Sequence, residues 1–353
     1  MCNMGEIEIA MDIKSSGQGG TPAQPADEFP QQTGGGLSRL LFSNVASGRE
    51  RTYVVSRKYP CTYNLILMRW KGRTQSSNVE DRRRRGGSKR TGTGIGLGTI
   101  VIAIIVFLFG GNPMAVLEQA SSSSGGQSTM HSGPSDEQND ELAAFVKVTL
   151  QDTEDVWNKL FQEYFGKSYR EPTLVLYNGS VRSACGMGSA AAGPFYCPAD
   201  MNMYIDLSFY TELSQRFGAS GDFAMAYVVA HEVGHHVQRL MGTTQQVDAQ
   251  RGRLPKAQFN DLSVRLELQA DFYAGVWAHH NEKMKGVLEQ GDIEEALNAA
   301  HAIGDDNLQK QAQGYVVPES FTHGTSAQRM KWFKLGFDTG DLRYGDTFSA
   351  NVL

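Results

Sequence analysis

The chain has 353 residues, of which 40% are hydrophobic and 20% are charged, as is ordinary for a globular protein. This length allows two domains, or one domain with long appendages, and the second fits better because dense hydrophobic patterning begins only near residue 140. The net charge of -5 is uneven: residues 68–91 carry +7, and the rest of the chain therefore sums to -12. A basic block of this kind can indicate nucleic-acid binding, but the apolar run that follows it excludes that function here.

Residues 1–67 give little indication of a fold. Residues 15–36 are rich in Gly, Gln, Pro and Ser, and such a segment cannot bury enough apolar surface to become ordered. We therefore expect residues 1–67 to be disordered or to precede the true start of the protein, with Met68 as a second plausible start.

The strongest apolar run is at residues 95–109, which contain no charge. With its small flanking residues the run extends over residues 92–111, about the 20 residues that a helix needs to cross a bilayer. The basic segment at 68–91 lies directly before it, so the positive-inside rule predicts that this segment is cytoplasmic and that the later chain lies outside. A cleaved signal peptide is the alternative, but no A-x-A-like site follows the run. We expect an uncleaved single-pass transmembrane helix at 92–111.

Residues 112–139 form a Ser/Gly-rich tether, and the globular part is expected at 140–353. Residues 173–177 and 203–207 are typical of short strands. Between them lie Cys185 and Cys197, and in a domain outside the membrane a disulfide between them is the natural interpretation. Zinc binding by the pair is possible, although no C-x-x-C spacing supports it.

An H-E-x-x-H motif formed by His231, Glu232 and His235 is the best-defined chemical signal. On a helix, positions i and i+4 share a face, so both imidazoles can bind one metal ion. Glu232 lies beside that face and can accept a proton from a water molecule that the metal acidifies. The acidic Asp222 before an uncharged run and Gly242 after the motif predict the two ends of a buried helix.

A catalytic zinc site needs a third protein ligand and an open position for water. Glu267 is the best candidate, because it lies in a segment of helical apolar periodicity where an inward carboxylate is costly unless it binds a metal. Asp271, four residues later, can accept a hydrogen bond from a ligand histidine and fix its tautomer. The sequence thus predicts zinc ligands at His231, His235 and Glu267, an arrangement that resembles the gluzincin metallopeptidases. Ordinary acids on a solvated helix edge are the alternative.

Residues 322–329, T-H-G-T-S-A-Q-R, form a further motif at an expected helix start. Membrane-anchored gluzincins of the CAAX-protease and heat-shock-protease kind have a His and an Arg at similar spacing late in the domain. By that resemblance His323 and Arg329 are catalytic: His323 binds the oxyanion and Arg329 helps to hold it. A donor aimed where negative charge develops is a large aid to such a reaction. The alternative is a capping histidine and a surface arginine.

Several motifs in order resemble the bacterial neutral zinc metallopeptidase family, the YpfJ-like membrane-anchored proteins. The resemblance covers residues 68–353, and its matching segments are 68–73, 77–82, 109–113, 196–198, 231–238, 267–271 and 323–329. It implies a bacterial protein of the inner membrane with its catalytic domain in the periplasm.

These observations predict an α+β, zincin-like domain, mostly helical with a small sheet, behind a single transmembrane helix. The expected function is a membrane-anchored zinc metallopeptidase that hydrolyses peptides or proteins, with Zn²⁺ as cofactor and Glu232 as general base. One alternative is a membrane-tethered binding or assembly protein whose structural zinc has four protein ligands. Another is a zinc amidase that acts on cell-wall peptides. No nucleic-acid partner is expected, and the sequence leaves the oligomeric state open.

Overall fold

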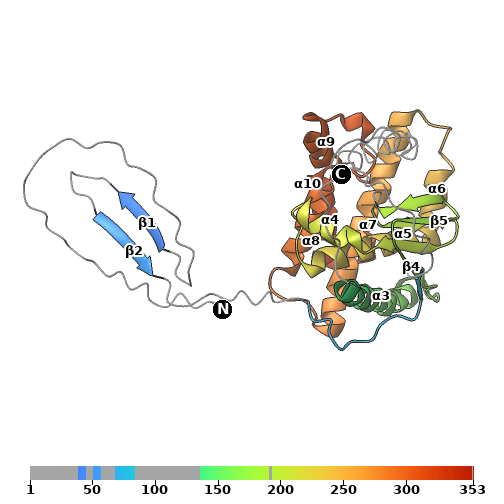
Figure 1. Ribbon diagram of the computed structural model, residues 1–353. Helices are drawn as coiled ribbons and strands as arrows, with labels where there is room; N and C mark the ends of the chain where they lie inside the picture. Colours follow the sequence, from blue (N-terminus) through green and yellow to red (C-terminus); the bar gives the residue numbers. More distant parts are fainter. Residues whose placement is uncertain (1–38, 45–50, 57–67, 84–135, 191–192, 352) are drawn as a thin grey trace, which may run out of the picture. The chain divides into compact units, whose positions relative to one another are not determined.

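A computed structural model describes residues 39–44, 51–56, 68–83, 136–190, 193–351 and 353 (Figure 1). The chain divides into two units, residues 1–65 and 66–353. In the first unit, β1 (Arg39–Asn44) and β2 (Arg51–Ser56) form an antiparallel pair. We expected no ordered structure in residues 1–67. β2 lies where aromatic and β-branched residues concentrate, which favours extended backbone, and β1 pairs with it along its full length.

The second unit contains a four-stranded sheet in the order β3-β4-β8-β7. Its strands are β3 (Val79–Asp81), β4 (Thr173–Tyr177), β7 (Phe195–Cys197) and β8 (Asn202–Asp206). β3, β4 and β8 are parallel, and β7 pairs antiparallel with β8 at the edge. The expected strands at 173–177 and 203–207 are thus β4 and β8, which occupy the centre because their residues are apolar and largely buried. A separate antiparallel pair consists of β5 (Ser180–Ser183) and β6 (Gly186–Ser189).

Most of the described residues of the second unit are in helices, and the prediction of a mostly helical fold with a small sheet is confirmed. The α-helices are α3 (Asp136–Phe165), α4 (Ser208–Gln215), α5 (Asp222–Met241), α6 (Thr243–Asp248), α7 (Lys256–Lys285), α8 (Asp292–Ala302), α9 (Asp305–Gln313) and α10 (Ser326–Thr339). Two 3-10 helices, η2 (Pro318–Ser320) and η3 (Leu342–Tyr344), complete the set. Helix α3 begins four residues before the expected domain start at 140.

Close helix packing brings α5 and α10 against α7 (Figure 1). Gly234 of α5 faces α7 so closely that an added Cβ would lie 2.9 Å from the carbonyl oxygen of Ala270. An added Cβ on Gly275 of α7 would lie 2.0 Å from the carbonyl oxygen of Phe333 in α10. One on Gly336 of α10 would lie 2.1 Å from the carbonyl oxygen of Phe272 in α7. Only glycine allows backbones to approach this far, and the α5–α7 contact lies within the H-E-x-x-H motif.

Residues 68–83 belong to this same folded unit rather than forming a separate tail. Met68 is 2% exposed, and its backbone N–H donates to Asp222 at 3.3 Å. β3 continues the parallel sheet, with Val79 opposite Leu174. We expected residues 68–91 to be separated from the domain by a membrane helix. The difference arises because strand pairing joins residues distant in sequence, which a reading of local charge and hydropathy does not detect.

The predicted transmembrane helix at 92–111 and most of the tether at 112–139 lie outside the described residues. Among the residues that are described, no helix combines the length and the apolar character needed to cross a bilayer.

Candidate metal centre

Helix α5 carries the H-E-x-x-H motif through the middle of the domain. Residues 223–230 are all buried, which accounts for the uncharged run before the motif. The helix begins at Asp222, and it ends at Gly242, which adopts the left-handed conformation at φ 87°. Both ends are therefore as the sequence predicted. One helical turn separates His231 from His235, and their ring centroids lie 4.8 Å apart.

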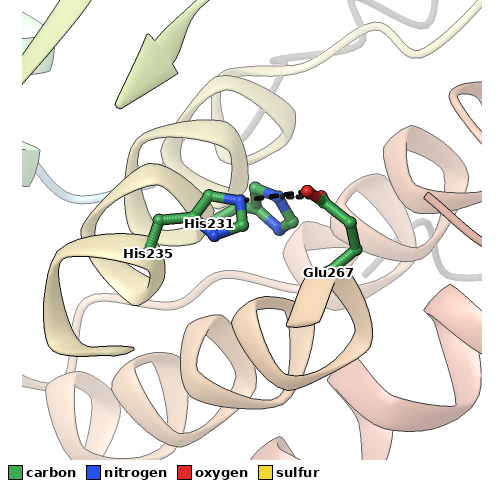
Figure 2. Close-up of side chains that lie close together, drawn as sticks. All are labelled: His231, His235 and Glu267. Carbon is green, nitrogen blue, oxygen red and sulfur yellow. Dashed lines mark hydrogen bonds and ion pairs between the residues drawn. The ribbon is translucent and has the colours of Figure 1, made fainter. Parts of the chain in front are cut away.

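Glu267 approaches the two histidines from α7, a different helix (Figure 2). Its Oε2 lies 3.2 Å from Nε2 of His231, and its Oε1 lies 3.5 Å from Nε2 of His235. One ligand atom from each of the three residues lies within 4.8 Å of the others. The close α5–α7 approach at Gly234 makes this possible, because it brings the two helices together beside the histidines. The structure thus brings together the three residues that the sequence selected as zinc ligands.

The donor set fits Zn²⁺ in both chemistry and spacing. Two imidazoles and one carboxylate are a common protein ligand set for catalytic zinc. Zinc bonds of about 2.0 to 2.2 Å in tetrahedral geometry separate ligand atoms by about 3.3 Å. The observed separations of 3.2 and 3.5 Å between Glu267 and the histidines agree with this value.

Asp271 and Gln238 accept hydrogen bonds from the Nδ1 atoms of the two histidines. Nδ1 of His231 lies 2.8 Å from Oδ1 of Asp271, and Nδ1 of His235 lies 2.9 Å from Oε1 of Gln238. Since both oxygens accept, each Nδ1 donates its proton, which leaves Nε2 of each ring as the atom that faces Glu267 and can bind a metal once it is deprotonated. Gln238 is oriented in turn, because its Nε2 donates 2.6 Å to the carbonyl of Leu266. Sequence analysis missed Gln238, although its position three residues after His235 on one helix was a usable signal.

Arg329 and Tyr227 complete a buried network around Asp271. The Arg329 guanidinium donates to both Asp271 oxygens at 2.9 and 3.0 Å, and to the Tyr227 hydroxyl at 3.1 Å. The Tyr227 hydroxyl itself donates to Asp271 at 2.6 Å. Arg329 is 2% exposed and Asp271 is fully buried. We expected Arg329 to help hold an oxyanion. In the structure its guanidinium donates instead to Asp271 and Tyr227, on the Nδ1 side of His231.

Opposite charges set the ionisation of this network. Burial by itself raises the pKa of Asp271, but the charges and hydrogen bonds of Arg329 and His231 outweigh it and bring that pKa to about 2. Burial by itself lowers the pKa of His231, yet Asp271 and Glu267 raise it to about 9. Zn²⁺ must displace that proton from His231, so zinc affinity falls as the pH is lowered.

Glu232 lies beside the three ligands and is not one of them. It is 8% exposed, and burial raises its pKa, although His235, His231 and the backbone N–H of Tyr196 act in the opposite direction. Tyr196 belongs to edge strand β7, so the carboxylate lies between the metal centre and the edge of the sheet. A buried carboxylate of raised pKa can both accept and return a proton near neutral pH.

His323 reaches the site from the loop before α10, where it is supported by Asp305. Asp305 is fully buried at the start of α9 and accepts backbone N–H groups from Thr322, His323 and Gly324 at 2.7, 2.7 and 3.1 Å. It also lies 3.3 Å from Nδ1 of His323. Burial lowers the pKa of His323, but Glu267 and Asp305 outweigh it and raise that pKa. Sequence analysis missed Asp305, whose position after Gly304 at a helix start was the only local hint.

The β7 strand is tied to its surroundings on both sides of Tyr196. Cys197 forms a disulfide with Cys185, with Cα atoms 5.8 Å apart. The hydroxyl of Tyr196 lies 2.9 Å from Nδ1 of His236, whose Nε2 donates to the Arg170 carbonyl at 2.5 Å. Burial lowers the pKa of His236 to about 4, so the ring is neutral and packs as a structural residue.

The family model described as "Putative neutral zinc metallopeptidase" matches residues 68–348. The chain belongs to this family. It is 50% identical over 292 residues to "Uncharacterized protein YpfJ" of Escherichia coli (strain K12), which covers 81% of this chain and all of that protein. It is 45% identical over 215 residues to "Uncharacterized protein Rv2575" of Mycobacterium tuberculosis, covering 58% of this chain and 70% of that protein. No solved structure matches the chain.

Membership of this zinc peptidase family and the His231, His235 and Glu267 group together confirm the expected cofactor, Zn²⁺. The resemblance drawn from the sequence motifs is confirmed as well, and the match begins at residue 68 as that resemblance did.

Proposed function

We propose that this protein is a zinc metallopeptidase that hydrolyses peptide bonds with Glu232 as general base. The observation that carries the proposal is the convergence of His231, His235 and Glu267 from two helices, with the buried Glu232 beside them. The described residues of this group supply three ligands, the number found in catalytic zinc sites, whereas structural sites have four. This count favours an enzyme over a binding protein with a structural metal.

Zn²⁺, when bound at these three ligands, supplies Lewis-acid chemistry and lowers the pKa of water to about 7. Glu232 accepts the proton that the attacking water loses and then donates it to the leaving amine. Its raised pKa suits both steps, because a proton carrier works best when its pKa lies near the working pH.

His323 supplies the donor for the developing oxyanion. Its Nδ1 faces Asp305, which leaves Nε2 as the atom that can donate to substrate. Glu267 and Asp305 raise the pKa of His323, which favours a protonated ring whose donor carries charge where it is most useful. Arg329 acts as a positioning residue: it fixes Asp271, which fixes the tautomer and orientation of His231.

The edge strand β7 supplies a surface for an extended substrate. β7 is the last strand in the sheet order, and its Tyr196 N–H is among the groups that lower the pKa of Glu232. An extended peptide can pair with an unpaired strand edge through its own backbone, which gives affinity with little dependence on side chains. A peptide or protein substrate laid along β7 therefore has its backbone next to the general base.

Replacing Glu232 with Gln tests the proposal, because Gln keeps the size of the side chain but cannot carry the proton. We expect Glu232→Gln to lose at least about a thousandfold in peptide hydrolysis while it retains one zinc per chain. Glu294→Gln, on the exposed face of α8, is the matched control and should hydrolyse like the parent. Unfolded proteins and purified cell-wall peptides should be assayed side by side. Hydrolysis that survives in Glu232→Gln contradicts the mechanism, and cleavage of wall peptides alone indicates an amidase.

We also propose that the zinc domain lies outside the cytoplasm and that the apolar run at 92–111 holds the protein at a bacterial inner membrane. The Cys185–Cys197 disulfide supports the first part, since cytosolic thiols are kept reduced. The β3–β4 pairing adds a constraint, because paired strands lie on one side of a membrane. Residues 68–83 then share the side of the domain, which is incompatible with a single crossing of the membrane at 92–111. We therefore propose that the apolar run associates with the membrane without separating its two flanks, and we retain neither the single-pass span nor the cytoplasmic position expected for residues 68–91.

Thiol labelling in cells tests this topology. Lys71 has an exposed side chain, so Lys71→Cys in a background with Cys2 and Cys61 changed to Ser provides one accessible thiol near β3. We expect a membrane-impermeant maleimide to label it in intact spheroplasts, with the same background lacking Lys71→Cys, whose remaining cysteines form the Cys185–Cys197 disulfide, as control. Labelling only after lysis contradicts the shared location of β3 and the domain.

A further inference from the structure

Three carboxylates gather at the first turns of α5 and α8, away from the ligands of the zinc centre. One oxygen each from Asp222, Asp292 and Glu295 lies within 4.8 Å of the others. Asp222 is 7% exposed and Asp292 is 1% exposed, so these charges are largely removed from bulk water. Gly221, at φ 120°, allows the close approach, because an added Cβ there would lie 1.9 Å from the carboxyl carbon of Glu295.

Backbone groups satisfy only part of the cluster. Asp222 accepts from Met68 at 3.3 Å, Asp292 from Glu289 at 2.9 Å and Glu295 from Phe223 at 3.1 Å. The second oxygen of Asp222 is buried and has no hydrogen-bond partner. A buried carboxylate oxygen without a partner is costly, and this one lies in a cluster whose other members are also acceptors.

No cation within the described chain compensates the three charges. None of the ion pairs among the described residues involves Asp222, Asp292 or Glu295; Arg69, next to Met68, pairs with Glu289, and Lys285 pairs with Asp152 and Asp155. Burial and mutual repulsion raise the pKa values of Asp292 and Glu295 to about 6 and about 7, and no basic side chain figures among the causes. At neutral pH the cluster therefore carries negative charge that the described residues do not neutralise.

We propose that Asp222, Asp292 and Glu295 form a calcium site that joins the first turns of α5 and α8. An all-oxygen set suits a hard cation and not a second zinc. Two oxygens on opposite sides of Ca²⁺ are about 4.6 to 5.2 Å apart, so carboxylate oxygens within 4.8 Å can all touch one ion. Glu295 is half-buried, which leaves room for water among the six to eight ligands that Ca²⁺ takes.

Such an ion would stabilise the base of the helix that carries the zinc ligands. Asp222 is the first residue of α5, and the same helix presents His231 and His235 further along. The ion would also tie α5 to α8 and, through the Met68 contact, to the segment that leads to β3. Its effect is therefore on stability, and it does not depend on the peptidase mechanism.

Calcium titration of the zinc-loaded full chain tests the site. In calcium-free buffer at pH 7.5, we expect added CaCl2 to give a saturable heat and to raise Tm by roughly 5 to 10 °C at a hundred times Kd. MgCl2 should act more weakly, because Mg²⁺ gives up its water reluctantly. Zinc content should stay at one per chain throughout.

Asp292→Asn and Glu295→Gln are the test variants, since each keeps a hydrogen-bond acceptor and removes one charge. We expect both to fold and to lose the calcium-dependent rise in Tm. Glu294→Gln removes the same charge from the same turn at an exposed position and should respond like the parent. A parent chain without a saturable calcium response overturns the proposal. So does a response that persists unchanged in both test variants.

Discussion

Replacing Asp271 with Asn separates the two tasks of the buried network behind His231. The carboxylate serves four donors: Nδ1 of His231, two nitrogens of Arg329 and the hydroxyl of Tyr227. An amide offers a single oxygen, and its NH₂ group points a donor at other donors. It also leaves the guanidinium of Arg329, which is 2% exposed, without a counter-charge.

The magnitude follows from that burial. Removing one partner of a buried ion pair costs about 3 to 5 kcal/mol. For a folded unit of this size we expect Tm to fall by roughly 6 to 20 °C. Loss of the oriented tautomer of His231 should also weaken zinc binding by about 10- to 100-fold. Thermal unfolding of the metal-free protein measures the first effect, and competition with a chromogenic chelator measures the second.

The double variant Asp271→Asn/Arg329→Met distinguishes the two effects. It removes the unpaired guanidinium as well, so most of the lost stability should return. Zinc affinity should stay low, because nothing restores the carboxylate on Nδ1 of His231. An Asp271→Asn protein that unfolds within about 1 kcal/mol of the parent would refute the reasoning. A double variant that also regains zinc affinity would show that Asp271 acts only through stability.

Three further predictions concern α7, α5 and α8. Glu267→Ala should lose zinc at chelator concentrations that the parent tolerates; one zinc retained there would mean a different third ligand. Gly234→Ala forces a Cβ to 2.9 Å from the carbonyl of Ala270 and should destabilise the protein by about 1 to 3 kcal/mol in denaturant unfolding, with weaker zinc binding; an unchanged midpoint contradicts the close approach. In calcium-free buffer, the free energy of unfolding of Asp292→Asn should increasingly exceed that of the parent from pH 4 to pH 7, by about 1 to 2 kcal/mol at pH 7 after solvent screening, as denaturant unfolding at each pH measures. Its folded pKa of about 6 exceeds the ordinary 3.8, so the folded state loses stability as this carboxyl ionises; a constant difference contradicts this.

Local sequence determined the chemical identity of this protein. Helical periodicity alone puts His231 and His235 on one face, and Asp222 and Gly242 mark the ends of that helix. Glu267 could be selected because an inward carboxylate in an apolar helix needs a charged partner. Each of these inferences depends on residues within a few turns of one another, where backbone geometry fixes what lies side by side.

Tertiary structure decided what crosses between distant segments. The pairing of β3 with β4 joins the basic N-terminal segment to the zinc domain, and charge and hydropathy suggested the opposite. The guanidinium of Arg329 binds Asp271, 58 residues away, so its position near His323 in sequence was a poor guide. The cluster of Asp222, Asp292 and Glu295 forms because the starts of two helices meet. Such contacts depend on how helices and strands pack, and packing is a property of the whole chain that no local pattern encodes.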